Sequence, residues 1–219
     1  IKLFSYDIDK TSDEDAYATA LGGYLQYSTD TNRSLYGTVR FHTSQPVGNT
    51  KNREATALFN NDKNGSALTV NSEAFIGWRG SGRILKVGNF MLNTPMMNDD
   101  TTRIVPWSYQ GAAFTGEVIP NIKAQLYHIT QIRSHTSDEY KKESASGKIG
   151  SGITMLGIEY DGFKHFDLQS YYYYAPDLYS TFILQADYEL IIDKDNLICA
   201  GLQYYNSGNG GKYAETENK

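Results

Sequence analysis

The side chains that usually carry enzyme chemistry are few in this chain and are not spaced for catalysis. The 219 residues include four histidines, and none of them pairs at i,i+4 or follows the spacing of zinc ligands. Gly150 to Gly152 does not complete the Gly-x-Ser-x-Gly frame of a hydrolase nucleophile, and Gly208 to Gly211 lacks the spacing of a phosphate-binding loop. The single Cys199 excludes a disulfide within the chain. We therefore expect no enzymatic activity, no metal site and no cofactor.

Apolar and polar side chains alternate along several segments, which is the pattern of β-strands. In the segment 181–192 the even positions are apolar or aromatic, whereas Gln185, Asp187 and Glu189 share the odd side. The same period recurs near 35–42, 73–79, 122–133, 163–174 and 197–205. No segment has convincing helical periodicity. The chain is therefore expected to be all-β, and its length favours a single domain.

Short turns and long polar connections follow one another in nearly strict order. Turn-forming residues occupy 29–32, 80–82, 120–121, 161–162 and 193–196, and long polar segments span 44–68, 91–106, 134–148 and 207 onward. The exception is 175–177, which is short where a long loop is due. About eleven strands lie between these connections, many near the ~9–11 residues of a tilted membrane-spanning strand. Strands of soluble sandwiches are nearer ~5–6 residues.

Long strands with short turns at one end and long loops at the other describe an antiparallel transmembrane β-barrel of the porin type. No run approaches the ~18 apolar residues of a spanning helix, and without helices only a closed barrel satisfies the backbone in lipid. Bacterial barrels have an even strand number, so about eleven strands indicate part of a barrel. An 18-stranded barrel needs about 360 residues at roughly 20 per strand and loop. We therefore expect residues 1–219 to be one partial barrel domain, truncated on the C-terminal side.

Charged side chains on the strands of such a barrel are expected to face water inside it. An Arg or Lys that faces lipid at mid-bilayer costs roughly 2–4 kcal/mol. The basic residues on the polar side of their strands are Arg40, Arg79, Lys86, Lys123 and Arg133. The acidic residues on that side are Asp167, Asp187 and Glu189. Simple solvation in a wet interior is the plainer role of each charge, and contact with a solute is the alternative.

An acidic cluster in the first loop has the composition of a cation site. It comprises Asp9, Asp13, Glu14 and Asp15. Hard cations such as Ca²⁺ prefer carboxylate oxygens, so this cluster would bind Ca²⁺ or bridge lipopolysaccharide. A solvated acidic surface loop is the plainer interpretation.

The segment 85–111 carries a recognisable series of motifs. Leu85 to Gly88 is followed by Thr94-Pro95, by Asp99-Asp100 with Arg103, by Pro106, and by Tyr109 with Gly111. This series resembles the OprD-type family of outer-membrane porins. Segments 19–23 and 41–46 also resemble members from Campylobacter-like bacteria. The chain departs from the family at 88–90, where members often continue glycine-arginine-glutamine, so one basic group expected near the constriction is missing.

The resemblance implies that the segment 91–106 is a long loop that folds into the lumen and narrows the pore. Asp99, Asp100 and Arg103 would then be the constriction residues, opposed by a track of basic side chains that guides substrate carboxylates. Arg103 either contacts solutes or pairs with an acidic neighbour to fix the loop, and the sequence leaves both roles open. The prolines at 95 and 106 would stiffen the loop by fixing φ.

The resemblance further implies passive diffusion of small hydrophilic solutes across the outer membrane of a Gram-negative bacterium. Amino acids, peptides or other carboxylates are the candidate solutes. The partners would be outer-membrane lipid and lipopolysaccharide, and a homotrimer is left open. A net charge of −5 without a basic stripe argues against a nucleic-acid partner. No signal peptide lies within these residues, which is uninformative about compartment.

Two other functions compete with a diffusion channel. A soluble or surface β-sandwich that binds carbohydrate or protein would suit the 18 tyrosines. In a sandwich the apolar rows would meet across a dry interior, whereas in a barrel they would face lipid. An outer-membrane barrel enzyme would need a Ser-His-acid set that these residues do not display.

Overall fold

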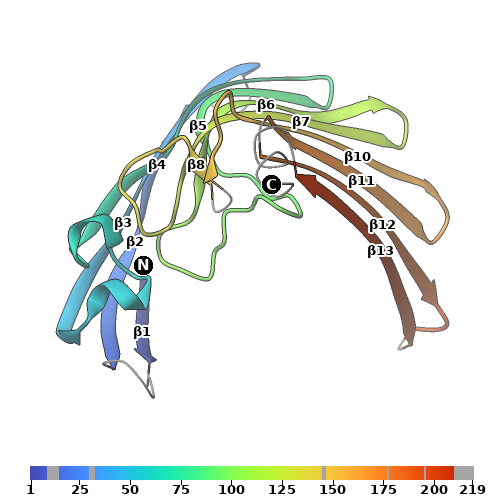
Figure 1. Cartoon of the computed structure of the whole chain (residues 1–219). Coiled ribbons are helices and arrows are strands. Elements are labelled where there is room, and N and C mark those ends of the chain that lie inside the picture. The colour runs from blue at the N-terminus through green and yellow to red at the C-terminus, as the bar shows by residue number, and fades with distance from the viewer. Residues whose placement is uncertain (9–14, 30–32, 145–146, 177, 195, 210–219) are drawn as a thin grey trace, which may run out of the picture. The chain divides into compact units, whose positions relative to one another are not determined.

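The computed structural model describes residues 1–8, 15–29, 33–144, 147–176, 178–194 and 196–209 (Figure 1). The main strands are Lys2–Ile8 (β1), Ala16–Ser28 (β2), Leu35–Lys51 (β3), Leu68–Gly80 (β4), Arg83–Phe90 (β5), Ser108–Ile119 (β6), Ile122–Arg133 (β7), Ile153–Phe163 (β10), Phe166–Ala175 (β11), Tyr179–Ile191 (β12) and Leu197–Asn209 (β13). Smaller elements are the strands Glu143–Ser144 (β8) and Gly147–Lys148 (β9), and the 3-10 turns Arg53–Thr56 (η1) and Asn61–Lys63 (η2). Across these ranges, no helix is long and apolar enough to cross a membrane.

Within the described ranges, eleven strands form one sheet in chain order, with β7 beside β10. The pairs β1–β2, β2–β3, β7–β10, β10–β11, β11–β12 and β12–β13 are antiparallel. Long connections span 52–67, 91–107 and 134–152, and the connections at 81–82 and 120–121 are tight turns. The predicted all-β antiparallel sheet of about eleven strands is confirmed.

Two predicted boundaries are wrong. Strand β3 continues to Lys51, because it pairs with β2 as far as Tyr17, so its loop begins well after the predicted start at Ser44. The residues at 161–162 are not a turn but part of β10, whose register shifts between Tyr160 and Phe163. An Asp-Gly pair suits such an irregularity as well as it suits a turn.

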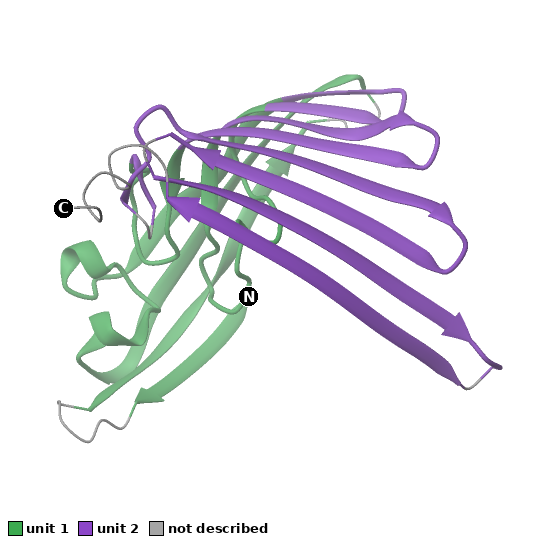
Figure 2. Cartoon of the chain, turned by 45° about the vertical axis from the view of Figure 1, so that its right-hand side comes forward, with its two compact units in different colours: residues 1–76, 87–110, 131–141 green, residues 77–86, 111–130, 142–219 purple. Residues whose placement is uncertain are grey.

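The chain divides into two compact units (Figure 2). Unit 1 comprises Ile1–Ile76, Val87–Gln110 and Gln131–Lys141. Unit 2 comprises Gly77–Lys86, Gly111–Thr130 and Lys142–Lys219.

Strand β3 in unit 1 buries its polar side and exposes its apolar side. Leu35 and Phe41 are 65% and 48% exposed, whereas His42 and Ser44 on the other side are 6% and 0% exposed. A sheet that folds in water does the reverse, because removing apolar surface from water is favourable. The exposed side therefore has the character of a lipid-facing surface. In the described part of unit 1, these apolar rows do not meet across a dry interior.

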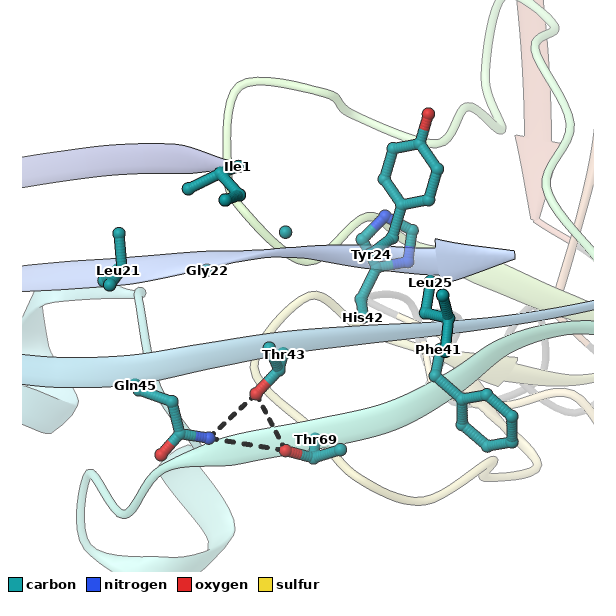
Figure 3. A pocket seen from close by; sticks show the side chains of 11 residues that line it. Ile1, Leu21, Gly22, Tyr24, Leu25, Phe41, His42, Thr43, Gln45 and Thr69 are labelled. Carbon is teal, nitrogen blue, oxygen red and sulfur yellow. Dashed lines mark hydrogen bonds between the residues drawn. The ribbon is translucent and has the colours of Figure 1, made fainter. Parts of the chain in front are cut away.

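Polar side chains interrupt the apolar row on the exposed side of β3. Gln45 Nε2 donates to Thr43 Oγ1 at 2.8 Å and to Thr69 Oγ1 at 3.4 Å, and the two hydroxyl oxygens lie 2.9 Å apart (Figure 3). Phe41 precedes this cluster on the same side of the strand. Val47 follows it on that side and is again exposed, so the hydroxyl and amide groups form a local polar patch within the apolar row.

The polar side of the unit 1 sheet carries a local apolar cluster, where two long loops pack on it. Small residues on β2 leave room for the loops. The cluster consists of Ala18, Ala20, Leu58, Phe59, Leu68, Val70, Ile104 and Val105, with Phe4 and Tyr6 packed against it. Ser44 Oγ donates to the carbonyl of Leu58 at 2.8 Å. Loops 52–67 and 91–107 therefore cover the side of the sheet opposite the exposed apolar rows.

In unit 2 too, one side of strand β11 is exposed and the other side is buried. On β11, Tyr172 and Tyr174 are exposed, whereas Tyr171 and Tyr173 are buried. The exposed tyrosines share their side with Phe182 of β12, which lies directly opposite Tyr172. Aromatic side chains with a polar tip suit the boundary between lipid and water.

Candidate functional site

Loop 91–107 joins β5 to β6 and is folded on itself. The backbone nitrogen and the hydroxyl of Thr94 both donate to the carbonyl of Met97, at 2.7 and 2.8 Å. The hydroxyl of Tyr109, on β6, donates to the carbonyl of Asn98 at 2.7 Å. The loop therefore has a defined shape and is fixed to the strand that follows it.

Asp100 shapes this loop. Its backbone nitrogen donates to Asn98 Oδ1 at 3.1 Å, and its Oδ1 accepts from the nitrogen and the hydroxyl of Thr102 at 3.2 and 2.5 Å. Its φ of 42° is in the left-handed region, which Asp tolerates better than most residues. The Thr102 hydroxyl is the main reason that the pKa of Asp100 lies below its ordinary value, so the carboxylate is charged at neutral pH.

Arg103 is held by an aromatic ring instead of by an acidic neighbour. Its guanidinium carbon lies 5.2 Å from the ring centre of Tyr6, and its Nη1 donates to the carbonyl of Thr102 at 3.3 Å. Among the described residues, no ion pair joins Arg103 to Asp99 or Asp100. Asp100 is nevertheless near enough to interact electrostatically with Arg103, although the two side chains form no direct ion pair.

A cavity of about 280 Å³ lies where loop 91–107 meets strands β1 to β3. Its lining includes Lys2, Tyr24, Arg40, His42, Asp99 and Arg103. Three of these side chains are cationic at neutral pH and one is a carboxylate. The cavity can therefore accommodate a small anion beside fixed positive groups.

Arg40 is fixed at the cavity wall from several directions. Its Nε lies 3.0 Å from Glu73 Oε2 and donates to Gln26 Oε1 at 2.7 Å. Its guanidinium carbon is 4.9 Å from the ring centre of Tyr24, which lies beside His42 (Figure 3). Sequence reasoning did not select Glu73 or Gln26, although Gln26 and Arg40 face each other in the β2–β3 register. Their positions on the polar sides of their strands were the signal available.

Comparison with known proteins agrees with this geometry. The sequence matches the family described as outer membrane porin, OprD family, over residues 35–218, which is most of the chain. The chain belongs to the OprD family of outer-membrane porins. The predicted family, porin-type fold class and location in the Gram-negative outer membrane are therefore confirmed. No curated protein matched the sequence.

Solved porins share the fold at low sequence identity. Acinetobacter baumannii OccAB3 superposes with a TM-score of 0.80 at 17% identity, covering 95% of this chain and 56% of that one. A. baumannii OccAB4 superposes with a TM-score of 0.79 at 15% identity, covering 96% of this chain and 57% of that one. Pseudomonas aeruginosa OpdK with vanillate superposes with a TM-score of 0.75 at 18% identity, covering 90% of this chain and 53% of that one. The chain thus spans about half the length of the solved structures it matches.

The structure corrects the predicted environment of Arg133. The side chain was expected to be solvated in the lumen, but it is fully buried at the end of β7. Its guanidinium is bonded to backbone carbonyls of two loops that close over it. Arg133 is therefore withdrawn from the pore-lining set of this porin.

The other three residues of the predicted basic track belong to unit 2. Arg79 is exposed on β4 and Lys86 is half-buried on β5. Lys123 Nζ lies 3.3 Å from Asp161 Oδ2, and both side chains are largely exposed. Of the basic track predicted for the porin, the structure places Arg40 at the cavity.

The predicted acidic residues share one side of the unit 2 sheet. Asp167 faces Asp187 directly across β11 and β12, and Glu189 lies two residues further along β12 on the same side. Gln185 Nε2 donates to Asp187 at 2.7 Å. Sequence reasoning missed Glu159 on β10, which accepts from the hydroxyl of Tyr171 at 3.2 Å. A role of these acids in the pore stays a prediction.

The acidic cluster of the first loop is not tested. Asp9, Asp13 and Glu14 lie outside the described residues. The carbonyl of Asp15 accepts from Asn52 Nδ2 at 3.1 Å. In the part of the chain that the structure describes, no three His, Cys, Asp or Glu side chains are grouped as metal ligands.

Two long loops of unit 1 are joined by a polar clasp. Asp62 Oδ2 accepts from Lys141 Nζ and from the hydroxyl of Ser137, both at 2.8 Å. Lys63 Nζ bonds Asp138 Oδ2 at 2.5 Å. Lys141 lowers the pKa of Asp62 more than Ser137 does, and Lys63 is the main cause of the lowered pKa of Asp138.

We predict that acid opens this clasp. Because the carboxyl pKa values are lowered in the folded state, the stabilisation is present above their ordinary value of about 4 and is lost as pH falls through the lower folded values. The pairs are solvent-exposed, so the loss of stability should be small. Hydrogen exchange of the amides at 60–64 and 134–141 should quicken at pH 3 beyond the intrinsic rate change. Asp62→Asn should quicken it already at pH 6, whereas the control Glu54→Gln should not. Equal protection in Asp62→Asn and the unmodified protein would contradict the clasp.

Proposed function

We propose that this chain forms the loop-narrowed part of a water-filled channel for passive diffusion of small hydrophilic carboxylates across the outer membrane. The observation that carries this proposal is the cavity beneath loop 91–107, where Lys2, Arg40 and Arg103 are opposed by Asp99. The proposal includes residues 1–219 as one partial barrel domain, with the segment 91–106 folded inward as the constriction.

A channel for carboxylates must attract the solute and also let it leave. A guanidinium offers a carboxylate two parallel donors, so Arg40 and Arg103 suit this group better than they suit a neutral solute. A channel must also release its solute, which requires weak binding. Asp99 provides an opposing charge beside the cations, and Glu73 neutralises Arg40 from the side. Amino acids, peptides and other carboxylates all present the group that this arrangement favours.

The proposal is tested by recording from the complete protein in planar bilayers. We expect discrete conductance steps and a reversal potential that indicates a preference for anions in a KCl gradient. OpdK has been crystallised with vanillate, so vanillate is a suitable probe here. Vanillate should interrupt the current, whereas the matched neutral vanillyl alcohol should not. Absence of steps would overturn the channel, and equal effects of the two compounds would overturn the carboxylate preference.

The surroundings of the protein form a second part of the proposal. Outer-membrane lipid would cover the exposed apolar rows, with lipopolysaccharide at the long-loop end. Assembly as a homotrimer is tested by measuring the mass of the detergent-solubilised complex. A β-sandwich that binds sugars is disfavoured, because its apolar rows would have to be buried instead of exposed.

A further inference from the structure

Arg133 is the most enclosed charge of the described chain. Of the charged side chains that the structure describes, Arg133 is the one with 0% solvent exposure. Burying an unpaired charge is costly, and such a group persists where hydrogen bonds compensate it. Its partners therefore show what the residue holds together.

The guanidinium of Arg133 bonds two loops at once. Its Nη2 donates to the carbonyl of Pro106 at 2.8 Å, at the end of loop 91–107. Its Nη1 donates to the carbonyls of Ser134 and Ser137 at 3.0 and 3.1 Å, on the loop that follows β7. Its Nε donates to Ser108 Oγ at 3.0 Å, on the first residue of β6. A rigid planar group thus joins the end of one loop to the start of another.

Tyr140 completes the enclosure. The guanidinium carbon lies 5.9 Å from the ring centre of Tyr140. The hydroxyl of Tyr140 donates to the carbonyl of Asn71 at 3.2 Å and lies 2.9 Å from Ser108 Oγ. The anchor is therefore connected to β4 as well as to β6 and β7. Because Arg133 has this many fixed partners, its side chain moves little.

The anchored end of loop 91–107 lies next to the cavity. Pro106 is three positions after Arg103, and the backbone nitrogen of Trp107 donates to the carbonyl of Asp99 at 2.7 Å. Ile104 and Val105 lie between Arg103 and Pro106 in the chain. Both pack in the apolar cluster with residues of β2 and β4. Moving Pro106 would therefore also move Asp99 and Arg103, which line the cavity.

We propose that Arg133 is a positioning residue that fixes the C-terminal end of loop 91–107 and thereby sets the width of the constriction. This inference rests on the proposed channel function. Arg133 acts through its fork of donors, because its side chain is fully buried and bonds two loops. A lysine keeps the charge but offers donors at a single nitrogen, so it cannot reach Pro106, Ser108 and Ser137 together.

The test compares Arg133→Lys and Arg133→Met with the control Lys164→Met, which removes an exposed cation from the turn between β10 and β11. In single-channel recordings both Arg133 variants should broaden the distribution of open levels, with current noise raised by about twofold or more as the aperture loosens. Lys164→Met should keep the native noise. If Arg133→Lys behaved like the unmodified protein while Arg133→Met changed only the reversal potential, Arg133 would act as a lumen charge and the inference would be overturned.

A second readout does not depend on conduction. A nitroxide attached to Thr101→Cys in a Cys199→Ser background reports the mobility of loop 91–107. Arg133→Lys should sharpen its spectrum, and Ser108→Ala, which removes one acceptor, should do so to a smaller degree. If the Arg133 variants fail to fold, Ser108→Ala decides, and an unchanged spectrum there overturns the inference. If the unmodified protein conducts no current, the channel proposal fails and the nitroxide spectra still decide the role of Arg133.

Discussion

A Gly22→Ala variant is expected to lose about 3 kcal/mol of folding stability, although it adds a single methyl group. A Cβ built at Gly22 would lie 2.1 Å from the carbonyl oxygen of Thr43 and 2.6 Å from Ile104 Cγ2. The first contact is with the backbone of the neighbouring strand, which cannot rotate away. The second is with loop 91–107, so the variant should also displace the loop that lines the cavity.

Urea unfolding of the purified protein in detergent or vesicles measures this loss of stability. The matched control is Gly37→Ala on β3, where the nearest atom to a new Cβ is the carbonyl oxygen of Phe75 at an ordinary 3.5 Å. That variant should unfold at nearly the native urea concentration. Gly22→Ala should also broaden the open levels of the channel. Equal midpoints for the two variants would show that β2 and β3 separate more easily than the structure indicates.

The alternation of side chains was predictable because it follows from bond geometry alone. Successive residues of a strand point to opposite sides, so Leu35 and Phe41 had to share a side that excludes Arg40 and His42. The same reasoning predicted Arg133 on the polar side of β7. It could not show that Arg133 is buried, because the burial depends on Pro106, which belongs to a loop distant along the chain, and on the way the following loop folds back to place the carbonyl of Ser137.

Other features required knowledge of strand pairing. Pro46 and Gly48 suggest a loop, yet β3 continues through them, because Pro46 pairs with Ala20 and Lys51 with Tyr17. Long-range pairing here overrides local turn chemistry. The role of Asp100 was also hidden, because an acidic residue that caps a turn and one that faces a solute have the same sequence signature.

The Arg40→Gln variant is expected to cause the largest change in how strongly a solute interrupts the channel current. The variant removes a fixed guanidinium from the cavity and should weaken interruption of the current by vanillate by about tenfold, since a charge-assisted hydrogen bond contributes roughly 1.5–3 kcal/mol. It should also destabilise the fold. Glu73, whose side chain is 8% exposed, would lose the partner that lies 3.0 Å away. Because Arg40 itself is 21% exposed, we expect about 2 kcal/mol, below the 3–5 kcal/mol of a fully buried pair.

Combining Arg40→Gln with Glu73→Gln separates these two effects. Removing the carboxylate removes the unpaired charge, so the double variant should recover most of the lost stability in a urea unfolding cycle. Vanillate block should stay weak in the double variant, because Arg40 lines the cavity and Glu73 supports it from the side. Full recovery of both stability and block would mean that Arg40 acts on the channel only by neutralising Glu73. Recovery of stability alone would assign to Arg40 a direct contact with the passing carboxylate.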